Sequence, residues 1–223
     1  MNIQRHLFSF IAVVTIALLF SCSSSKSLSN PAVSSANPGT EQRDSQRRLL
    51  GKLDREDKVA AVALARQLID QGDPMAMAYL GARHLDGSNV PKDRVKADEL
   101  FERASKLGDA EVDFLIGKTF AHCRCEGNKK AAFDWYSRAA SRGHLVATFD
   151  LGGMYELGFG VPKDAKKAFA QFLKAAELGH PKAMSKVAES YSKGVGVKRS
   201  ESLAKEWSGK ASAAVIKQSL PKQ

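Results

Sequence analysis

The sequence predicts an all-α protein, built as a solenoid of stacked helix-turn-helix repeats. Three observations predict this fold class: a motif that recurs about every 36 residues, apolar residues at helical spacing within each unit, and small residues at fixed positions where helices would cross. One such pair of helices cannot bury its apolar face alone, so the units are expected to stack on one another.

The composition is that of a globular protein with a basic charge balance. The 223 residues include 34 Lys and Arg against 24 Asp and Glu, which gives a formal net charge of +10. Hydrophobic residues make up 43% of the chain, and its 17 Gly and 7 Pro are too few for a fibrous or fully disordered protein. Three Cys are too few for a disulfide framework. The charge permits an acidic partner such as anionic lipid, nucleic acid or protein, without choosing among them.

Residues 1–21 are predicted to be a signal peptide. Arg5 is the only charged residue before Lys26, and an apolar stretch interrupted by one Ser and one Thr runs over 7–20. This stretch is too short for a typical transmembrane helix and has the length of a signal-peptide core. Later apolar runs are too short to span a bilayer.

The Leu-Phe-Ser-Cys sequence at 19–22 resembles the lipobox of bacterial lipoproteins. The resemblance implies cleavage before Cys22 and a lipid anchor on it, whereas an ordinary secretory peptide is the alternative. The same resemblance, with Ser and not Asp at the next position, implies the outer membrane, facing the periplasm. Residues 22–42 are then expected to form a flexible Ser-rich tether, because they carry too little apolar surface to offset the entropy of ordering.

Residues 43–72 are predicted to be a degenerate repeat that caps the N-terminal end, and 73–219 to form four full repeats. The fourth repeat lacks the closing Gly and ends in a Lys- and Ser-rich helix, which suits a C-terminal cap with a polar outer face. An aliphatic residue followed by a small one marks the first helix of each full repeat. These pairs are Leu80-Gly81, Ile116-Gly117, Leu151-Gly152 and Val187-Ala188.

Each unit is predicted to contain two helices joined by a turn. In the first helix, apolar residues recur at i, i+4 and i+8, as at Ala147, Leu151 and Tyr155. Gly in the turn supplies the positive φ that a chain reversal requires. Asp164 lies at the start of a second helix, where its carboxylate can cap free N–H groups.

Taken together, these positions match the Sel1-like repeat, a relative of the tetratricopeptide repeat. Residues 147–179 carry nearly all of its pattern, A-x-x-x-L-G-x-x-Y-x-x-G-x-G-V-x-x-D-x-x-K-A-x-x-W-Y-x-K-A-A-x-x-G, and the resemblance covers about 73–215. It implies a right-handed α-solenoid whose partners lie against the first helices of the repeats.

Two His residues invite a catalytic interpretation but occupy a structural position. His144 and His180 each follow a closing Gly, and other repeats have Asp73 and Asp109 at the same place. A polar residue there, followed by Pro in two of the four cases, is a signal for the start of a helix. Both His are therefore predicted to be helix N-caps.

The turn of the second repeat is unusual because a His-Cys-Arg-Cys run replaces its Gly residues. Cys123 and Cys125 stand in this run, beside His122. Three interpretations stay open: turn residues without chemistry, a strained local disulfide, or a metal or redox site that would need further ligands.

No catalytic motif occurs in the sequence. It has no Gly-rich phosphate loop, no His-Glu-x-x-His and no Gly-x-Ser-x-Gly. The protein is therefore predicted not to be an enzyme and to need no cofactor, metal or small-molecule substrate. Export argues against nucleic acid, and the concentration of basic residues in 181–223 argues against binding along an anionic polymer.

The predicted binding surface is the inner face of the solenoid, formed by the first helices. Phe114 and Phe149 occupy equivalent positions there and could anchor a peptide or loop, with inter-helix packing as the alternative. In the first repeat, the inner positions are Ala78, Ala82 and Leu85. The predicted partner-binding residues are Phe114, Lys118, Phe149, Glu156, Ser185 and Glu189.

The sequence thus predicts a non-enzymatic, membrane-anchored periplasmic scaffold or adaptor that binds another envelope protein on this inner face. The alternative is an immunity lipoprotein that neutralises a phospholipase toxin delivered into the periplasm by a secretion system. That alternative comes from the resemblance, because some lipoproteins with these repeats act in this way.

Overall fold

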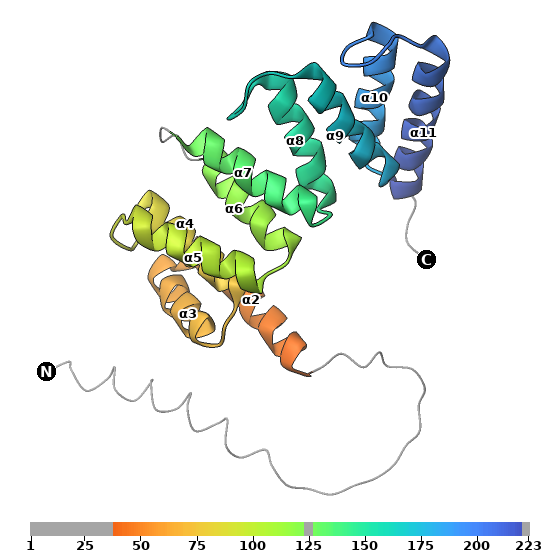
Figure 1. The fold of residues 1–223 in the computed structure, drawn as a ribbon. Helices are drawn as coiled ribbons and strands as arrows, with labels where there is room; N and C mark the ends of the chain where they lie inside the picture. Colours follow the sequence, from red (N-terminus) through yellow and green to blue (C-terminus); the bar gives the residue numbers. More distant parts are fainter. Residues whose placement is uncertain (1–37, 123–126, 220–223) are drawn as a thin grey trace, which may run out of the picture. The chain divides into compact units, whose positions relative to one another are not determined.

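The computed structural model describes residues 38–122 and 127–219. The predicted signal peptide (1–21), the predicted lipidation site Cys22, and both Cys123 and Cys125 lie outside the described residues. Within them the fold consists of ten α-helices and no strand, so the predicted all-α class is confirmed (Figure 1). None of these helices is both long and apolar enough to cross a membrane.

Consecutive helices pair into repeats, and each repeat contacts the next. The paired helices are α4 with α5, α6 with α7, α8 with α9, and α10 with α11, while α2 and α3 precede them. The helices are α2 (Pro38–Glu56), α3 (Lys58–Asp70), α4 (Pro74–Asp86), α5 (Arg94–Leu107), α6 (Ala110–His122), α7 (Asn128–Ser141), α8 (Leu145–Leu157), α9 (Ala165–Glu177), α10 (Pro181–Lys193) and α11 (Glu201–Ser219).

Helix α2 begins at Pro38, so the last five residues of the predicted tether, 38–42, are helical. The sequence from Glu41 onward is rich in Arg, Gln and Leu, which favour helix. Leu50 of this helix is buried among small and aliphatic residues of α3 and α4. Arg47 Nε donates to Asp73 Oδ2 at 2.8 Å, which ties α2 to the residue that caps α4.

The predicted N-caps are confirmed. His144 Nδ1 accepts a hydrogen bond from the Ala147 N–H at 3.0 Å, and His180 Nδ1 accepts one from Ala183 at 3.2 Å. Asp164 likewise accepts from a backbone N–H of α9. Because Nδ1 of each ring accepts a backbone hydrogen bond, Nε2 is the nitrogen that can donate.

The two helices of a repeat cross at a small residue. A Cβ atom added to Gly152 of α8 would lie 2.6 Å from the ring of Phe172 in α9, so only Gly allows this approach. The fourth repeat has Ala188 of α10 at the position of Gly152 and Ser208 of α11 at the position of Phe172. The larger residue on α10 is thus matched by a smaller one on α11. Equivalent crossings pair Gly81 with Phe101 and Gly117 with Tyr136.

Successive repeats are joined by their turns. Gly160 and Gly196 have φ of +72° and +73°, and a Cβ on either would collide with a backbone carbonyl at the start of the preceding second helix. Those carbonyls belong to Lys129 and Ala165. The second Gly of each Gly-x-Gly turn therefore serves two purposes, a left-handed conformation and a close contact between repeats.

Candidate protein-interaction surface

The first helices of the full repeats, α4, α6, α8 and α10, carry the residues predicted to bind a partner. Phe114 and Phe149 are each half-buried. The ring of Phe114 stacks on that of His144 with centroids 4.3 Å apart, and Phe149 stacks on His180 at 4.6 Å. Each Phe thus packs against the N-cap of the following repeat.

Both rings also contact an aromatic residue of their own repeat. Phe114 lies 5.7 Å from Tyr136, and Phe149 lies 5.5 Å from Phe172, measured between ring centroids. Truncation of either Phe would loosen the packing between repeats as well as remove exposed apolar surface. Their part in partner binding stays a prediction, and other positions on the same helices offer cleaner tests of it.

The charged residues predicted to orient the partner differ in their surroundings. Glu156 accepts from Lys186 through both carboxylate oxygens at 3.0 Å, and Glu189 accepts from Lys193 at 2.6 Å. This hydrogen bond lowers the pKa of Glu189. Lys118 is exposed and has no ion pair within the described part of the chain.

The remaining predicted residue, Ser185, is exposed on α10, and its hydroxyl donates to the Pro181 carbonyl at 3.3 Å. The six predicted residues are therefore distributed over three helices rather than gathered at one point. Lys118 is the one whose charge is available to a partner, because Glu156 and Glu189 are already paired with lysines.

A hollow of about 580 Å³ lies between α4 and α6, which contact each other. Its floor is mostly apolar, and charged side chains stand at its rim. The inner-face positions predicted for the first repeat all line it, as does Lys118, but the sequence did not reveal that they enclose a hollow. Its lining residues are Met75, Ala78, Tyr79, Ala82, Arg83, Leu85, Asp86, Leu115, Lys118, Thr119 and His122.

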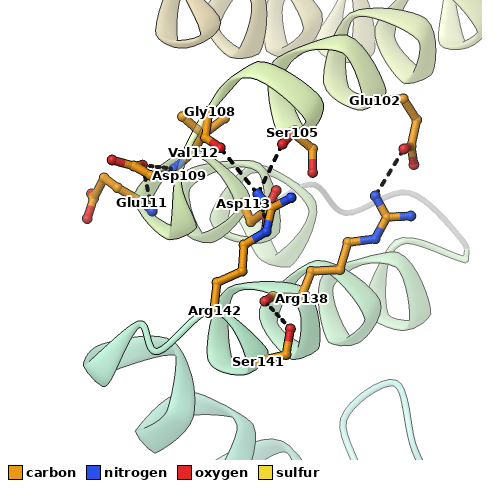
Figure 2. A network of polar contacts seen from close by, with 10 residues as sticks. All are labelled: Glu102, Ser105, Gly108, Asp109, Glu111, Val112, Asp113, Arg138, Ser141 and Arg142. Atoms are coloured by element: carbon orange, nitrogen blue, oxygen red, sulfur yellow. Dashed lines mark hydrogen bonds and ion pairs between the residues drawn. The ribbon is translucent and has the colours of Figure 1, made fainter.

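A second polar feature lies where the first repeat meets the second (Figure 2). Asp113 of α6 is fully buried, and one of its carboxylate oxygens lies 2.9 Å from Arg142 Nη1. The same guanidinium donates to the carbonyls of Ser105 at 3.0 Å and Gly108 at 3.4 Å. These contacts bind the end of one repeat to both helices of the next, so we assign the cluster a structural role.

The sequence analysis missed this cluster, although a comparison of repeats contains its signal. The position of Asp113 is apolar or uncharged elsewhere, and the position of Arg142 is aliphatic. The other repeats have Met77, Thr148 and Met184 at the first position and Leu107 and Leu178 at the second. Two positions that depart from the repeat pattern together, with opposite charges, indicate a contact.

No group of three or more His, Cys, Asp or Glu that could hold a metal ion occurs among residues 38–122 and 127–219. Many ion pairs in this part of the chain join residues three or four apart on one helix, and others link neighbouring repeats. The predicted face itself carries apolar, charged and hydrogen-bonding side chains, as at Phe149, Lys118 and Ser185.

Comparison with known proteins agrees with the geometry of the repeats. The Sel1 repeat matches four segments, residues 74–109, 123–144, 145–180 and 181–214. A Sel1 repeat protein from Oxalobacter formigenes has a similar structure, with a TM-score of 0.58 and 24% identity over 80% of this chain and 76% of that one. This likeness shows the fold.

Another similar structure is that of c5321, a protective antigen of uropathogenic Escherichia coli strains. It has a TM-score of 0.54 and 26% identity, and the match covers 82% of this chain but only 43% of that one. The immunity protein Pa5087 from Pseudomonas aeruginosa matches with a TM-score of 0.43 and 19% identity, over 80% of this chain and 84% of that one, which is too distant to support an argument about function. Curated proteins gave no significant match. With four matched segments that cover more than half of its length, the chain belongs to the Sel1 repeat family.

Proposed function

We propose that this protein is a lipid-anchored periplasmic adaptor that binds another envelope protein on its first helices and has no catalytic activity. Sel1 repeats form scaffolds that are suited to protein–protein interaction. The observation that carries the proposal is the hollow between α4 and α6, which places apolar surface on the predicted face together with Lys118, a cation that pairs with no described carboxylate. A pocket with an apolar floor and a few polar groups is the usual form of a binding site.

The anchor is the first part of the proposal to test. It is supported by the Leu-Phe-Ser-Cys sequence at 19–22 and by the apolar stretch before it. Cells grown with labelled palmitate should incorporate the label into the wild-type protein and not into Cys22→Ser, which should accumulate as precursor or as a soluble form. An unlabelled wild-type protein would contradict the anchor without bearing on the binding surface.

The binding surface can be tested by photo-crosslinking in intact cells. A benzoylphenylalanine residue is placed at Thr119 of α6 or Ser185 of α10, and the control position is Lys174, which is exposed on the second helix α9. We expect a protein adduct from at least Thr119 and none from Lys174. Equal adducts at all three positions, or an adduct at Lys174 alone, would contradict binding on the first helices.

The identity of the crosslinked protein decides between the adaptor and the immunity protein, the two functions that the sequence analysis considered. An envelope protein of the same cell supports the adaptor. A phospholipase that reaches the periplasm only when neighbouring cells deliver it would replace the adaptor with an immunity protein. In that case, loss of the first-helix contact should also make cells sensitive to the enzyme.

A further inference from the structure

We propose that the hollow between α4 and α6 binds a partner segment in which an apolar side chain lies next to an acidic one; this inference rests on the proposed function and specifies its partner. The hollow is built from two neighbouring first helices, and its apolar floor and cationic rim come from different parts of them. Each of these features restricts the chemistry of the segment.

The floor selects an apolar side chain. Ala78 and Leu85 are buried beneath the hollow, while Met75, Ala82 and Leu115 are half-buried and face open space. Burial of this surface against another apolar group is favourable in proportion to the area removed from water. The volume of about 580 Å³ has the size of pockets that hold small ligands, so it fits a short segment or a side-chain pair, not a domain.

Arg83 supplies the first argument for an acidic neighbour. Its Nε is buried and has no hydrogen-bond partner among the described residues. The nearest carboxylates, those of Asp54 and Asp86, lie 3.8 and 3.9 Å from its terminal nitrogens, beyond hydrogen-bonding distance. Each also accepts a shorter bond elsewhere, Asp54 from the Tyr79 hydroxyl at 2.6 Å and Asp86 from the Ser88 N–H at 2.7 Å.

The guanidinium of Arg83 is also held in a fixed orientation. It lies over the ring of Tyr79, with 5.2 Å between its central carbon and the ring centroid. The Arg83 side chain is 20% exposed, so water reaches only part of it. The buried Nε is closed to a ligand, but the terminal nitrogens of the guanidinium are not buried and make no hydrogen bond with a described residue. A carboxylate of the bound segment would reach these nitrogens and form a charge-assisted hydrogen bond.

Lys118 supplies the second argument, from the opposite helix. Its Nζ lies 5.6 Å from the centroid of the Phe114 ring, and it forms no ion pair with a described residue. It acts on Asp150 only at longer range, where its charge opposes the rise that burial causes in the pKa of that carboxyl. His122 also lines the hollow, and Asp86 is the one acidic residue among the described residues that line it. Lys118 therefore places a positive charge without a described counter-ion beside the apolar floor, whereas Arg83 already lies 3.8 and 3.9 Å from two carboxylates. The charge of Lys118 disfavours a basic segment.

The first step of the test identifies the sequence that the hollow prefers. Random short peptides displayed on phage are selected against the full chain, held in mild detergent. We expect the selected peptides to be enriched in Leu, Ile or Phe next to Asp or Glu. Enrichment of basic or purely apolar peptides would overturn the proposal, and so would the absence of any selected peptide.

The second step assigns the peptide to the hollow, with a selected peptide labelled by a fluorophore and its Kd measured by anisotropy. Lys118→Gln removes an exposed charge and leaves the core untouched, Arg83→Gln removes the guanidinium, and Lys174→Gln on α9 is the matched control. We expect each of the first two to weaken binding by about tenfold or more, because bonds to charged groups contribute this much, and Lys174→Gln to leave it unchanged. Replacing the acidic residue of the peptide by its amide should have the same effect as Lys118→Gln.

Two outcomes would overturn this inference. If both hollow variants bind the peptide normally while Ser185→Arg on α10 abolishes binding, this inference fails and the proposed function stands. If vesicles containing phosphatidylglycerol bind the protein and Arg83→Gln with Lys118→Gln releases it, the hollow holds a lipid and the proposed peptide is wrong. The crosslinking at Thr119 and Ser185 decides the proposed function independently of either result.

Discussion

The second and third repeats use the same position in their first helices in different ways. In the second repeat the position is Asp113, fully buried and paired with Arg142 at 2.9 Å. In the third it is Thr148, whose hydroxyl donates to the His144 carbonyl at 2.9 Å within its own helix. The third repeat satisfies its polar atom locally, whereas the second depends on a partner at the far end of the repeat. The comparison shows that the same position in the repeat can hold a polar side chain that bonds within its own repeat unit near its helix start, or one that needs a charged partner from the end of the next helix.

The largest expected effect comes from removing the Asp113–Arg142 ion pair of the second repeat. Arg142→Leu leaves the Asp113 carboxylate buried without its partner and should lower the free energy of unfolding by ~3–5 kcal/mol. Urea titration followed by circular dichroism measures this loss. The third repeat already has Leu178 at the position of Arg142, so it contains no equivalent ion pair that could be removed.

The matched control restores the pattern of the other repeats. Asp113→Met together with Arg142→Leu gives the second repeat the residues found at Met77 and Leu107 in the first. We expect this double variant to be neutral or more stable than wild type by ~1–4 kcal/mol, since an apolar residue escapes the cost of desolvating the Asp113 carboxylate, which is fully buried while Arg142 is 40% exposed. A double variant as unstable as Arg142→Leu would show that the pair does not act as a unit.

A smaller effect is expected at two adjacent glycines of α8, which lie in different surroundings. A Cβ at Gly152 would lie 2.6 Å from Phe172, whereas a Cβ at Gly153 meets nothing within 4 Å. Gly152→Ala should therefore destabilise the protein by ~1–3 kcal/mol through overpacking. Gly153→Ala should instead stabilise it by up to about 1 kcal/mol, because Ala favours helix. Thermal unfolding of the two variants side by side gives opposite shifts, and shifts of the same sign would contradict the assigned helix crossing.

The smallest effect concerns the His caps, which the second repeat lacks because Asp109 occupies that position. Burial, followed by the charge of Lys182, lowers the pKa of His180 below 6.5. The folded protein then binds fewer protons than the unfolded chain, so this contribution is complete above pH 6.5 and is lost as the pH falls from 6.5 to the folded-state pKa.

His180→Asn tests this dependence because Asn caps helices without titrating over that range. The wild-type Tm should fall more steeply than that of His180→Asn as the pH drops below 6.5. The difference between the two proteins in the free energy of unfolding should stay under the ~1 kcal/mol typical of a helix cap. If the curves of Tm against pH are parallel for the two proteins, titration of His180 does not contribute to the pH dependence of stability.

The elements that repeat are the ones that the sequence predicts well. Asp164, His144 and His180 could be identified as caps because each follows a local rule that applies at equivalent places along the chain. Gly160 could likewise be assigned to a turn. Its contact with the preceding repeat was not predictable, because that contact depends on how two repeats are positioned in space.

The candidate site was predicted less completely, for a related reason. The inner-face positions were found from the repeat, and Lys118 among them lines the hollow. The stacking of Phe114 on His144 was not found, since it joins side chains of different repeats. The unsatisfied Nε of Arg83 has no signature in sequence at all, because it results from the bonds that Asp54 and Asp86 make elsewhere.

The central claim is that a partner lies on the first helices, at α4 and α6. Hydrogen–deuterium exchange of the protein with and without the partner identified by crosslinking tests it most directly, because it reports every helix in one measurement. The account predicts slower exchange in Pro74–Asp86 and Ala110–His122, with α5, α7 and α9 unchanged. Slower exchange confined to α5, α7 and α9 would contradict it and move the interface to the second helices.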